Sequence, residues 1–239
     1  MSSLTAADDE APSRPRGSLS DKDVGVGERD ESTDLEDRTS LNRSTYDRIA
    51  ARYVENQIRQ ESGNDNLFSS LQEAFLTSLP VGGVVADLGC GPARDGARFA
   101  AEGFRVVGMD LSSGMLAAAT DLAGCLAQGD LRAIPIAGST LDGIWSTAAL
   151  LHVPERDTDQ VLREFRRALH PAGTLALVTA LGETSRLEAV PYAPSEQRWY
   201  VYRSSEVLRQ QLESAGFAIS TEDHIAGTRV WCAILAQAL

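Results

Sequence analysis

The chain has 239 residues, of which 43% are hydrophobic and 23% charged, so it can form one sizeable domain with a buried core. Its formal net charge of −12 would repel a polyanion at long range, which disfavours a nucleic-acid partner such as tRNA or DNA. No stretch approaches the roughly 18 apolar residues of a membrane span, and the polar N-terminus lacks the apolar centre of a secretory signal. We therefore expect a cytoplasmic protein with no membrane partner.

Two residue types exclude further chemistries. Lys22 is the only lysine and lies in the charged N-terminal stretch. A Schiff-base enzyme and a P-loop protein both need a lysine inside the fold, so neither class fits. The three cysteines, Cys90, Cys125 and Cys232, are too few and too widely spaced for a disulfide framework or a CxxC zinc site. We expect buried thiols and no metal site.

The N-terminal stretch differs from the rest of the chain. Residues 1–42 contain scarcely any large apolar side chain and cannot bury enough surface to offset the entropy of ordering. We predict a disordered acidic tail over residues 1–42 and one folded domain over residues 43–239. Near-helical apolar spacing predicts helices from Thr45 to Ile58 and over residues 67–79.

The remaining sequence alternates apolar runs with amphipathic stretches, as a parallel sheet with crossover helices does. We predict strands over residues 84–88, 104–109, 125–128, 141–146, 174–180, 217–221 and 229–236. We predict helices over residues 93–102, 112–122, 156–169 and 205–215. Residues 182–203 are polar, and we expect them to form an irregular insertion that lies over a site.

The segment VVADLGCGPARDG carries the clearest chemical signal. Asp87 ends a predicted strand, and Gly89 and Gly91 follow in the turn to a helix. Glycines there allow a sharp turn and the close approach of a ligand to the main chain. Arg94 stands at the third glycine position of a dinucleotide fingerprint, and Asp87 would repel a phosphate, which disfavours an NAD-dependent oxidoreductase. A carboxylate suits S-adenosylmethionine, which presents an ammonium group and has no phosphate.

Two more acids follow the next predicted strands. Asp110 comes roughly 20 residues after the glycine turn, where a carboxylate can accept hydrogen bonds from both ribose hydroxyls. Asp130 follows the third strand and could bind the adenine amino group. Each acid alone could be a helix cap or a turn residue. Three carboxylates at three successive strand ends are more specific.

These segments resemble the class I S-adenosylmethionine-dependent methyltransferases, particularly the bacterial small-molecule type. The resemblance covers residues 43–239. The motifs that carry it are YDRIAARY (46–53), DLGCGPARD (87–95), VVGMDLSSGML (106–116), GDLRAIPI (129–136), LDGIWSTAALLHVP (141–154), RRALHPAGTLAL (166–177) and LRQQLESAGFAI (208–219). Residues 146–149 lack the NPPY-like tetrapeptide of amino-methylating nucleic-acid enzymes, which argues against DNA or glutamine as the acceptor.

The resemblance implies a Rossmann-like three-layer α/β sandwich, in which a mostly parallel seven-stranded sheet has an antiparallel last strand. It implies S-adenosyl-L-methionine as the cofactor, with Tyr46 and Tyr53 on a helix that closes over it. Further residues that the motifs place in the cofactor site are Cys90, Arg94, Leu111, Met115, Leu131 and Ser146.

His152 is the best catalytic candidate, because it follows the fourth predicted strand at the edge where open α/β sheets place ligands. It could deprotonate or orient an acceptor, or it could bond to a backbone carbonyl and shape the loop. Arg198 could clamp an acidic acceptor or be solvated. The aromatic residues could wall the acceptor pocket or belong to the core; they are Tyr46, Tyr53, Trp199, Tyr200 and Tyr202.

The favoured function is methyl transfer to O, N or C of a small molecule. RWYVY (198–202) resembles a segment of wobble-uridine tRNA methyltransferases, but the acidic balance and the missing lysines argue against that activity. A domain that binds the cofactor as a non-catalytic scaffold is the third alternative.

Overall fold

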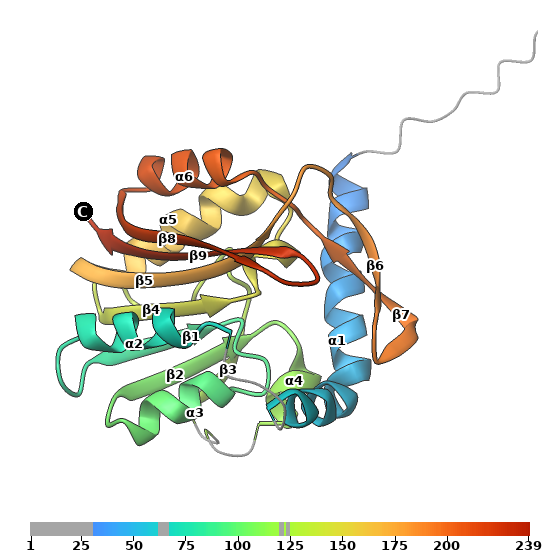
Figure 1. Cartoon of the computed structure of the whole chain (residues 1–239), viewed down its shortest axis with the longest axis horizontal. Helices are drawn as coiled ribbons and strands as arrows, with labels where there is room; N and C mark the ends of the chain where they lie inside the picture. The colour runs from blue at the N-terminus through green and yellow to red at the C-terminus, as the bar shows by residue number, and fades with distance from the viewer. Residues whose placement is uncertain (1–30, 62–66, 120–121, 123–124) are drawn as a thin grey trace, which may run out of the picture.

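Figure 1 shows the computed structural model, which describes residues 31–61, 67–119, 122 and 125–239. A seven-stranded sheet with strand order β3-β2-β1-β4-β5-β9-β8 forms its centre. The strands are β1 Val84–Leu88, β2 Arg105–Asp110, β3 Leu126–Gln128, β4 Leu141–Thr147, β5 Leu169–Leu181, β8 Phe217–Ala226 and β9 Val230–Ala238. Neighbours from β3 to β5 pair in parallel, whereas β9 pairs antiparallel with both β5 and β8. The predicted sheet, with its antiparallel last strand, is confirmed.

Helices cover both faces of this sheet, which makes the predicted three layers. Helices α5 (Thr158–Ala168) and α6 (Ser205–Ser214) share one core with the sheet, and α2 (Ser69–Ser78) and α3 (Arg94–Ala101) share the other. Successive strand residues enter opposite cores, so Leu177 of β5 packs on the first side and Val178 on the second. Because both faces are covered, the central strands are nearly continuous apolar runs.

Helix α1 (Glu31–Glu61) stands across one end of the sheet (Figure 1). Asp47 fixes it there, since one carboxylate oxygen accepts hydrogen bonds from Ser112 Oγ (2.7 Å) and Gly114 N (2.8 Å) at the start of α4 (Ser113–Ala117). A Cβ on Gly114 would come within 2.7 Å of the Asp47 Cα atom. The contact between the two helices therefore requires glycine.

The predicted boundary at residue 42 differs from the structure, because α1 already begins at Glu31. Contacts distant in sequence anchor its first half: Asn42 is buried against Trp199, and the Arg38 guanidinium lies 4.0 Å from the centre of the Trp199 ring. Composition does not reveal such partners. The tail predicted over residues 1–30 lies outside the described residues.

The sequence led us to expect an irregular segment over residues 182–203, and this prediction is wrong. They contain an antiparallel hairpin of β6 (Arg186–Val190) and β7 (Ala193–Tyr200), which forms a sheet of its own beside α1. Many hairpin side chains are polar and exposed, and this hides the strand periodicity. Helix α4 is also shorter than the helix predicted over residues 112–122, of which residues 120 and 121 lie outside the described part.

The hydrogen bonds of Asn42 allow a prediction of how much the contact between α1 and the hairpin contributes to stability. Its Nδ2 donates to Trp199 O (3.0 Å), and its Oδ1 accepts from Trp199 N (2.7 Å), so the amide replaces a neighbouring strand. We expect Asn42→Ala to lower the free energy of unfolding by about 1–3 kcal/mol, because Trp199 N loses its bond to Asn42 and Trp199 O keeps only its bond to His152. Urea unfolding measures this. The exposed Glu55→Ala on the same helix should change it by less than about 0.5 kcal/mol; equal effects would contradict the prediction.

Candidate active site

The turn after β1 is built from glycines because no Cβ fits. Gly89 N and Cys90 N both donate to Met109 O, at 2.7 and 3.0 Å, which joins this turn to the end of β2. Gly89 has φ +78°, and a Cβ there would lie 2.2 Å from the Ala149 Cβ. Gly91 has φ +54°, and a Cβ there would meet nothing within 4 Å. The backbone at Gly91 is thus open to the close approach of a ligand.

Asp110 joins this turn to the next one. Its Oδ2 accepts a hydrogen bond from Gly91 N (2.8 Å), and its Oδ1 accepts one from Ser112 N (2.8 Å). Burial raises the pKa of Asp110, while these backbone donors oppose the rise. Each carboxylate oxygen keeps a lone pair with which it could accept a further hydrogen bond.

Asp87 lies deeper, with 3% of its surface exposed. Its Oδ2 accepts from Gly96 N (3.1 Å) in the first turn of α3. Burial, and next the charge of Asp95, raise its pKa well above the ordinary value. A positively charged ligand would favour the ionised form of this carboxyl.

Asp130 lies beyond the end of β3 but is already paired. Arg132 donates to both carboxylate oxygens, with the shortest distance 2.7 Å from Nη2, and its Nη1 bonds to Asp157 at 3.0 Å. Although burial raises the pKa of Asp130, the bonds from Arg132 bring it below the ordinary value. The strand order β3-β2-β1 places all three acids along one edge of the sheet.

The other residues expected in the cofactor site occupy several environments. Ser146 is fully buried, and its hydroxyl donates to Leu88 O (2.9 Å), which ties β4 to β1. Met115 is also buried and packs with Ile49 of α1. Cys90, Arg94, Leu111 and Leu131 are half-buried. Burial raises the pKa of the Cys90 thiol, so it stays protonated.

His152 lies at the end of a 3-10 turn, Leu150–His152, between α1 and β7. Its Nδ1 lies 3.0 Å from Trp199 O, and its Nε2 lies 2.7 Å from the Tyr46 hydroxyl. The tautomer that fits has Nδ1–H donating to the carbonyl and Nε2 accepting from the phenol. Arg198 Nη1 in turn donates to the Tyr46 oxygen (3.2 Å). Both predicted roles of His152, bonding to a carbonyl and facing the acceptor side, therefore remain compatible with its position.

Arg203, which the sequence reading missed, holds this turn in place. It is 2% exposed, and its guanidinium donates to Thr158 Oγ1 and to the carbonyls of Leu150, Val153 and Val201. Burial lowers its pKa to about 10, so it stays charged at neutral pH. No local sequence pattern marks it, because its partners are distant in sequence.

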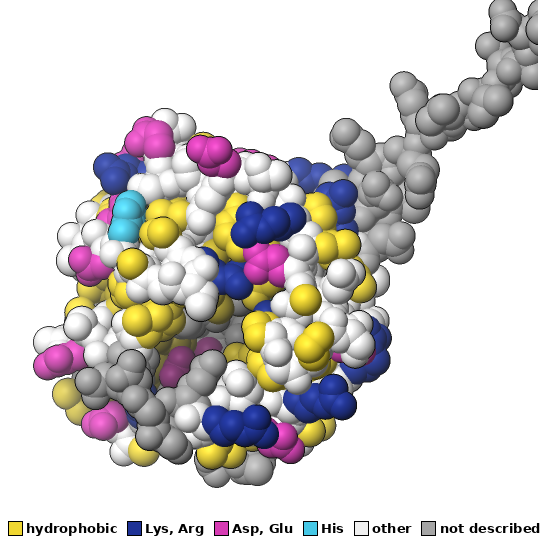
Figure 2. Space-filling model, turned by 45° about the vertical axis from the view of Figure 1, so that its right-hand side comes forward, with side chains coloured by type: hydrophobic (Ala, Val, Ile, Leu, Met, Phe, Trp, Pro, Cys, Tyr) yellow, Lys and Arg dark blue, Asp and Glu magenta, His cyan; other side chains and the backbone are white. Residues whose placement is uncertain are grey.

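Aromatic rings surround His152 and Arg198. Tyr46 packs edge-on against Tyr53 and His152, and Tyr53 packs in the same way against Tyr192. Tyr200 lies 5.0 Å from the His152 ring and stacks on Tyr202, which is buried too. Figure 2 shows a hollow on this side of the molecule, with acidic side chains inside it and apolar side chains along its borders. The predicted aromatic wall is thus also a small core.

Comparisons with known proteins agree with this geometry. Residues 85–173 match a family model described as a methyltransferase domain. A malonyl-[acyl-carrier protein] O-methyltransferase of Enterobacter lignolyticus is 29% identical over 143 residues, which are 59% of this chain and 54% of that protein, so the chain spans about half its length. A demethylmenaquinone methyltransferase of Mycobacterium marinum is 27% identical over 197 residues, 73% of this chain and 84% of that one.

A solved structure has the same fold and contains a demethylated cofactor. It is the 1,6-didemethyltoxoflavin-N1-methyltransferase of Burkholderia thailandensis with bound 1,6-didemethyltoxoflavin and S-adenosylhomocysteine, similar with a TM-score of 0.60 and 18% identity over 80% of this chain and 87% of that chain. The chain therefore contains a methyltransferase domain, and its fold is that of the class I S-adenosylmethionine-dependent methyltransferases.

The methyl donor of this methyltransferase is S-adenosylmethionine, and its residues fit that cofactor. The open backbone at Gly91 allows close approach, and the carboxylates of Asp87 and Asp110 favour a cation over a pyrophosphate. Among the described residues of the methyltransferase, no helix has the length and apolarity to cross a membrane.

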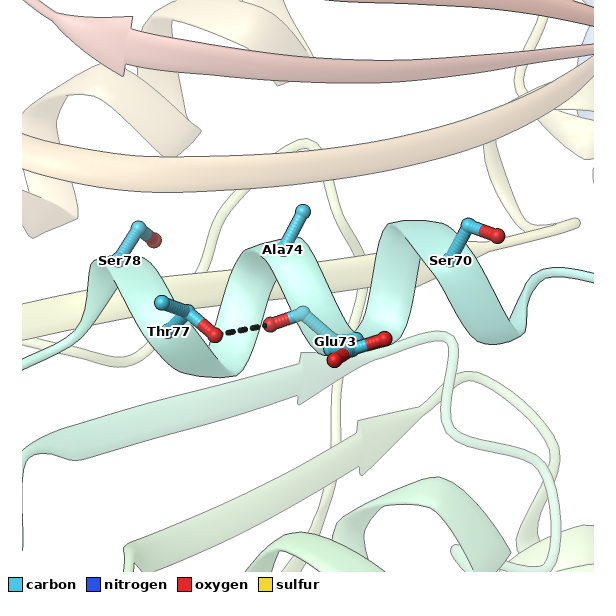
Figure 3. A pocket seen from close by; sticks show the side chains of 5 residues that line it. All are labelled: Ser70, Glu73, Ala74, Thr77 and Ser78. Carbon is cyan, nitrogen blue, oxygen red and sulfur yellow. Dashed lines mark hydrogen bonds between the residues drawn. The ribbon is translucent and has the colours of Figure 1, made fainter.

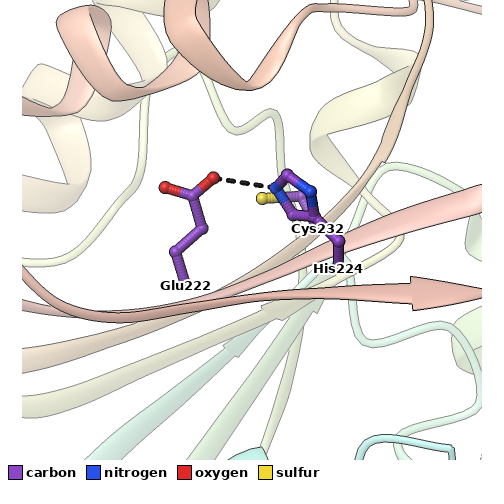
Figure 4. A group of neighbouring side chains, drawn as sticks. All are labelled: Glu222, His224 and Cys232. Carbon is purple, nitrogen blue, oxygen red and sulfur yellow. Dashed lines mark hydrogen bonds and ion pairs between the residues drawn. The ribbon is translucent and has the colours of Figure 1, made fainter.

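Two other features of the methyltransferase do not form a site. Glu222 and His224 of β8 lie beside Cys232 of β9 (Figure 4). The Glu222 carboxylate already accepts from His224 (2.9 Å), Arg209 (2.8 Å) and Ser205 (2.6 Å). Burial raises the pKa of the Cys232 thiol to about 12, so this thiol is protonated at neutral pH. Glu222 is thus occupied by an ion pair to Arg209 of α6 and by a hydrogen bond to His224 on its own strand.

The second feature is an open depression along α2 (Figure 3). Its lining residues are Ser70, Glu73, Ala74, Thr77 and Ser78. All of them come from one helix, and Thr77 Oγ1 bonds to the helix's own carbonyl at Glu73 (2.8 Å). In the described part of the chain, no side chain from another element lines this depression, so the arrangement offers no chemistry.

The low pKa of His152 predicts that the free energy of unfolding depends on pH. Burial lowers its pKa to about 3, and the positive charges of Arg198 and Arg229 add to the shift. In the unfolded chain its pKa is about 6.5. Because the folded value is the lower one, the stabilisation is complete above about pH 6.5 and is lost as the pH falls toward 3.

We therefore expect the stability advantage of the wild type over His152→Gln to shrink between pH 6.5 and pH 5, by up to about 1.4 kcal/mol per pH unit. Urea unfolding of both proteins at a series of pH values measures the difference. An advantage that stays constant down to pH 5 would show that the folded protein can protonate His152.

Proposed function

We propose that this methyltransferase transfers the methyl group of S-adenosylmethionine to a small-molecule acceptor, which binds between the Leu150–His152 turn, α1 and the hairpin. The observation that carries the proposal is the row of carboxylates on adjacent strand ends beside an open glycine turn. A second group, made of buried aromatic rings and Arg198, lies next to it and offers a place for the acceptor.

On the cofactor side, Asp110 is in position to accept hydrogen bonds from the ribose hydroxyls with the lone pairs that Gly91 and Ser112 leave open. Gly91 presents backbone without a Cβ, and Asp87 supplies negative potential behind the turn. Asp130 is held by Arg132, so we assign it to shaping the adenine side of the site. Tyr46 and Tyr53 of α1 cover the site on the side of the hairpin.

On the acceptor side, the bonded row Arg198–Tyr46–His152 holds three side chains in one orientation. His152 is neutral at working pH, and its Nε2 accepts the Tyr46 hydroxyl. A proton taken from an acceptor by His152 would have to pass through that hydroxyl, so we assign His152 to positioning Tyr46. A general base is needed only for an acceptor that is protonated at working pH.

When bound, S-adenosylmethionine supplies a methyl group on a sulfonium, which is already a good leaving group. Alignment of the acceptor can then provide most of the acceleration. The fixed Tyr46 and Arg198 side chains and the rigid turn held by Arg203 suit this task. The two relatives are named for a protein-bound malonyl group and for a quinone. This spread leaves O, N and C acceptors open.

Asp110→Ala tests the cofactor side of the proposal. We expect it to weaken binding of S-adenosylhomocysteine by about 1.5–3 kcal/mol, since hydrogen bonds to a charged group are lost. Calorimetric titration of the full chain measures the affinity. Asp223→Ala removes an exposed carboxylate of β8 and should leave the affinity unchanged. If Asp110→Ala binds as tightly as this control, the ribose assignment fails.

A further inference from the structure

Arg198 is a buried cation whose carboxylate-binding edge has no partner. Only 7% of its surface is exposed, and no carboxylate lies within 4 Å of it among the residues that the structure describes. Its Nη1 donates to Tyr46, but its Nε, which is inaccessible to solvent, makes no hydrogen bond to any described residue. A buried charge without an ionic partner lowers the stability of a protein, so the presence of Arg198 at this position calls for an explanation.

Other arginines of the same chain show what that edge does when it is paired. Arg48 bonds to Glu196, and Arg132 bonds to Asp130, in each case through Nε and Nη2 together. This side-by-side pair of donors matches the two oxygens of a carboxylate. In Arg198 the same edge has no protein partner in the described part of the chain.

Neighbouring acids do not neutralise Arg198. Glu188 faces it in register across the hairpin, yet its carboxylate bonds to Arg229 and Tyr202 and pairs with Arg186. Arg203 is also buried, but carbonyls and Thr158 satisfy its guanidinium. Among the described residues, the lack of a partner for its Nε sets Arg198 apart from its neighbours.

A second unpartnered polar atom lies in the same cluster. The Tyr192 hydroxyl is buried and makes no hydrogen bond to a described residue. Tyr192 packs against Tyr53. Burial raises the pKa of Tyr53, and Tyr192 and Asp110 add to the rise, whereas the charge of Arg198 opposes it. Tyr53 thus lies within electrostatic range of both Arg198 and the ribose-binding carboxylate.

We propose that Arg198 and the Tyr192 hydroxyl bind a carboxylate group of the methyl acceptor, so that the substrate class is a small carboxylic acid. This inference rests on the proposed function. The aromatic rings of Tyr46 and Tyr200, which lie 5.7 and 5.2 Å from the guanidinium carbon, form apolar walls for the rest of the acceptor. The carboxylate serves as the anchor and takes no part in a bond change, so no proton or electron moves in this step.

The test uses the full chain saturated with S-adenosylhomocysteine and titrates benzoate and its neutral analogue benzamide by calorimetry. We expect benzoate to bind at least about tenfold more tightly, as hydrogen bonds to charged groups allow. Arg198→Met should abolish the preference, and Tyr192→Phe should weaken benzoate about fivefold through loss of one hydrogen bond. Arg186→Met, which removes an exposed arginine of the same hairpin, should keep the preference.

Equal affinity of the wild type for benzoate and benzamide would overturn the inference without any variant. Tighter binding of phenyl phosphate than of benzoate would assign the site to a phosphate and overturn the carboxylate. Failure of the wild type to bind S-adenosylhomocysteine would instead contradict the proposed function. We also expect Arg198→Met to melt no lower than the wild type, because removal of a buried charge that has no carboxylate partner offsets the lost bond to Tyr46. A lower melting temperature with an unchanged preference would make Arg198 structural.

Discussion

The carboxylate of Asp110 is the interaction on which the site depends. It receives one backbone N–H from the glycine turn after β1 and another from the turn after β2, so it fixes two loops that belong to different strands. The glycine turn can occupy this place only because Gly89 brings no Cβ toward Ala149. Removal of either feature would take away a contact that fixes the turn after β1. The cofactor site is therefore a property of the sheet edge as a whole.

A second constraint holds the acceptor side. Helix α1 bridges α4 and the hairpin, through Asp47 on one side and Asn42 on the other. The two buried arginines of this region have different roles in this account. Arg203 is satisfied by the backbone and stiffens the Leu150–His152 turn, whereas Arg198 keeps its carboxylate-binding edge unpaired. Rigid surroundings and a buried cation with an open edge suit the acceptor site that we propose.

The sequence predicted the parts of the fold that local patterns determine. Apolar runs such as Val84–Leu88 identified the sheet strands because parallel strands are buried on both faces. The acids Asp87, Asp110 and Asp130 were found because each directly follows or ends such a run. Strand boundaries were less accurate, and β8 continues to Ala226, five residues beyond its predicted end at residue 221.

Contacts between distant residues could not be predicted in this way. The pairing of Asn42 with Trp199 and of Tyr46 with His152 joins residues more than one hundred positions apart. The hairpin and the early start of α1 depend on such contacts. Asp130 and Arg132 are only two positions apart in the sequence. Their bond nevertheless depends on the conformation of the loop, which the sequence spacing alone does not reveal. The identity of the site residues was thus easier to predict than their hydrogen-bond partners.

The central claim is that this sheet edge holds an adenosine compound that carries an ammonium group and no phosphate. Thermal unfolding with S-adenosylhomocysteine or NADH, each at one hundred times a typical dissociation constant, tests it most directly. We expect S-adenosylhomocysteine to stabilise the protein by about 2.7 kcal/mol, which raises the melting temperature by about 5–10 °C for a domain of this size, and NADH to have no effect. A shift with NADH and none with S-adenosylhomocysteine would contradict the account.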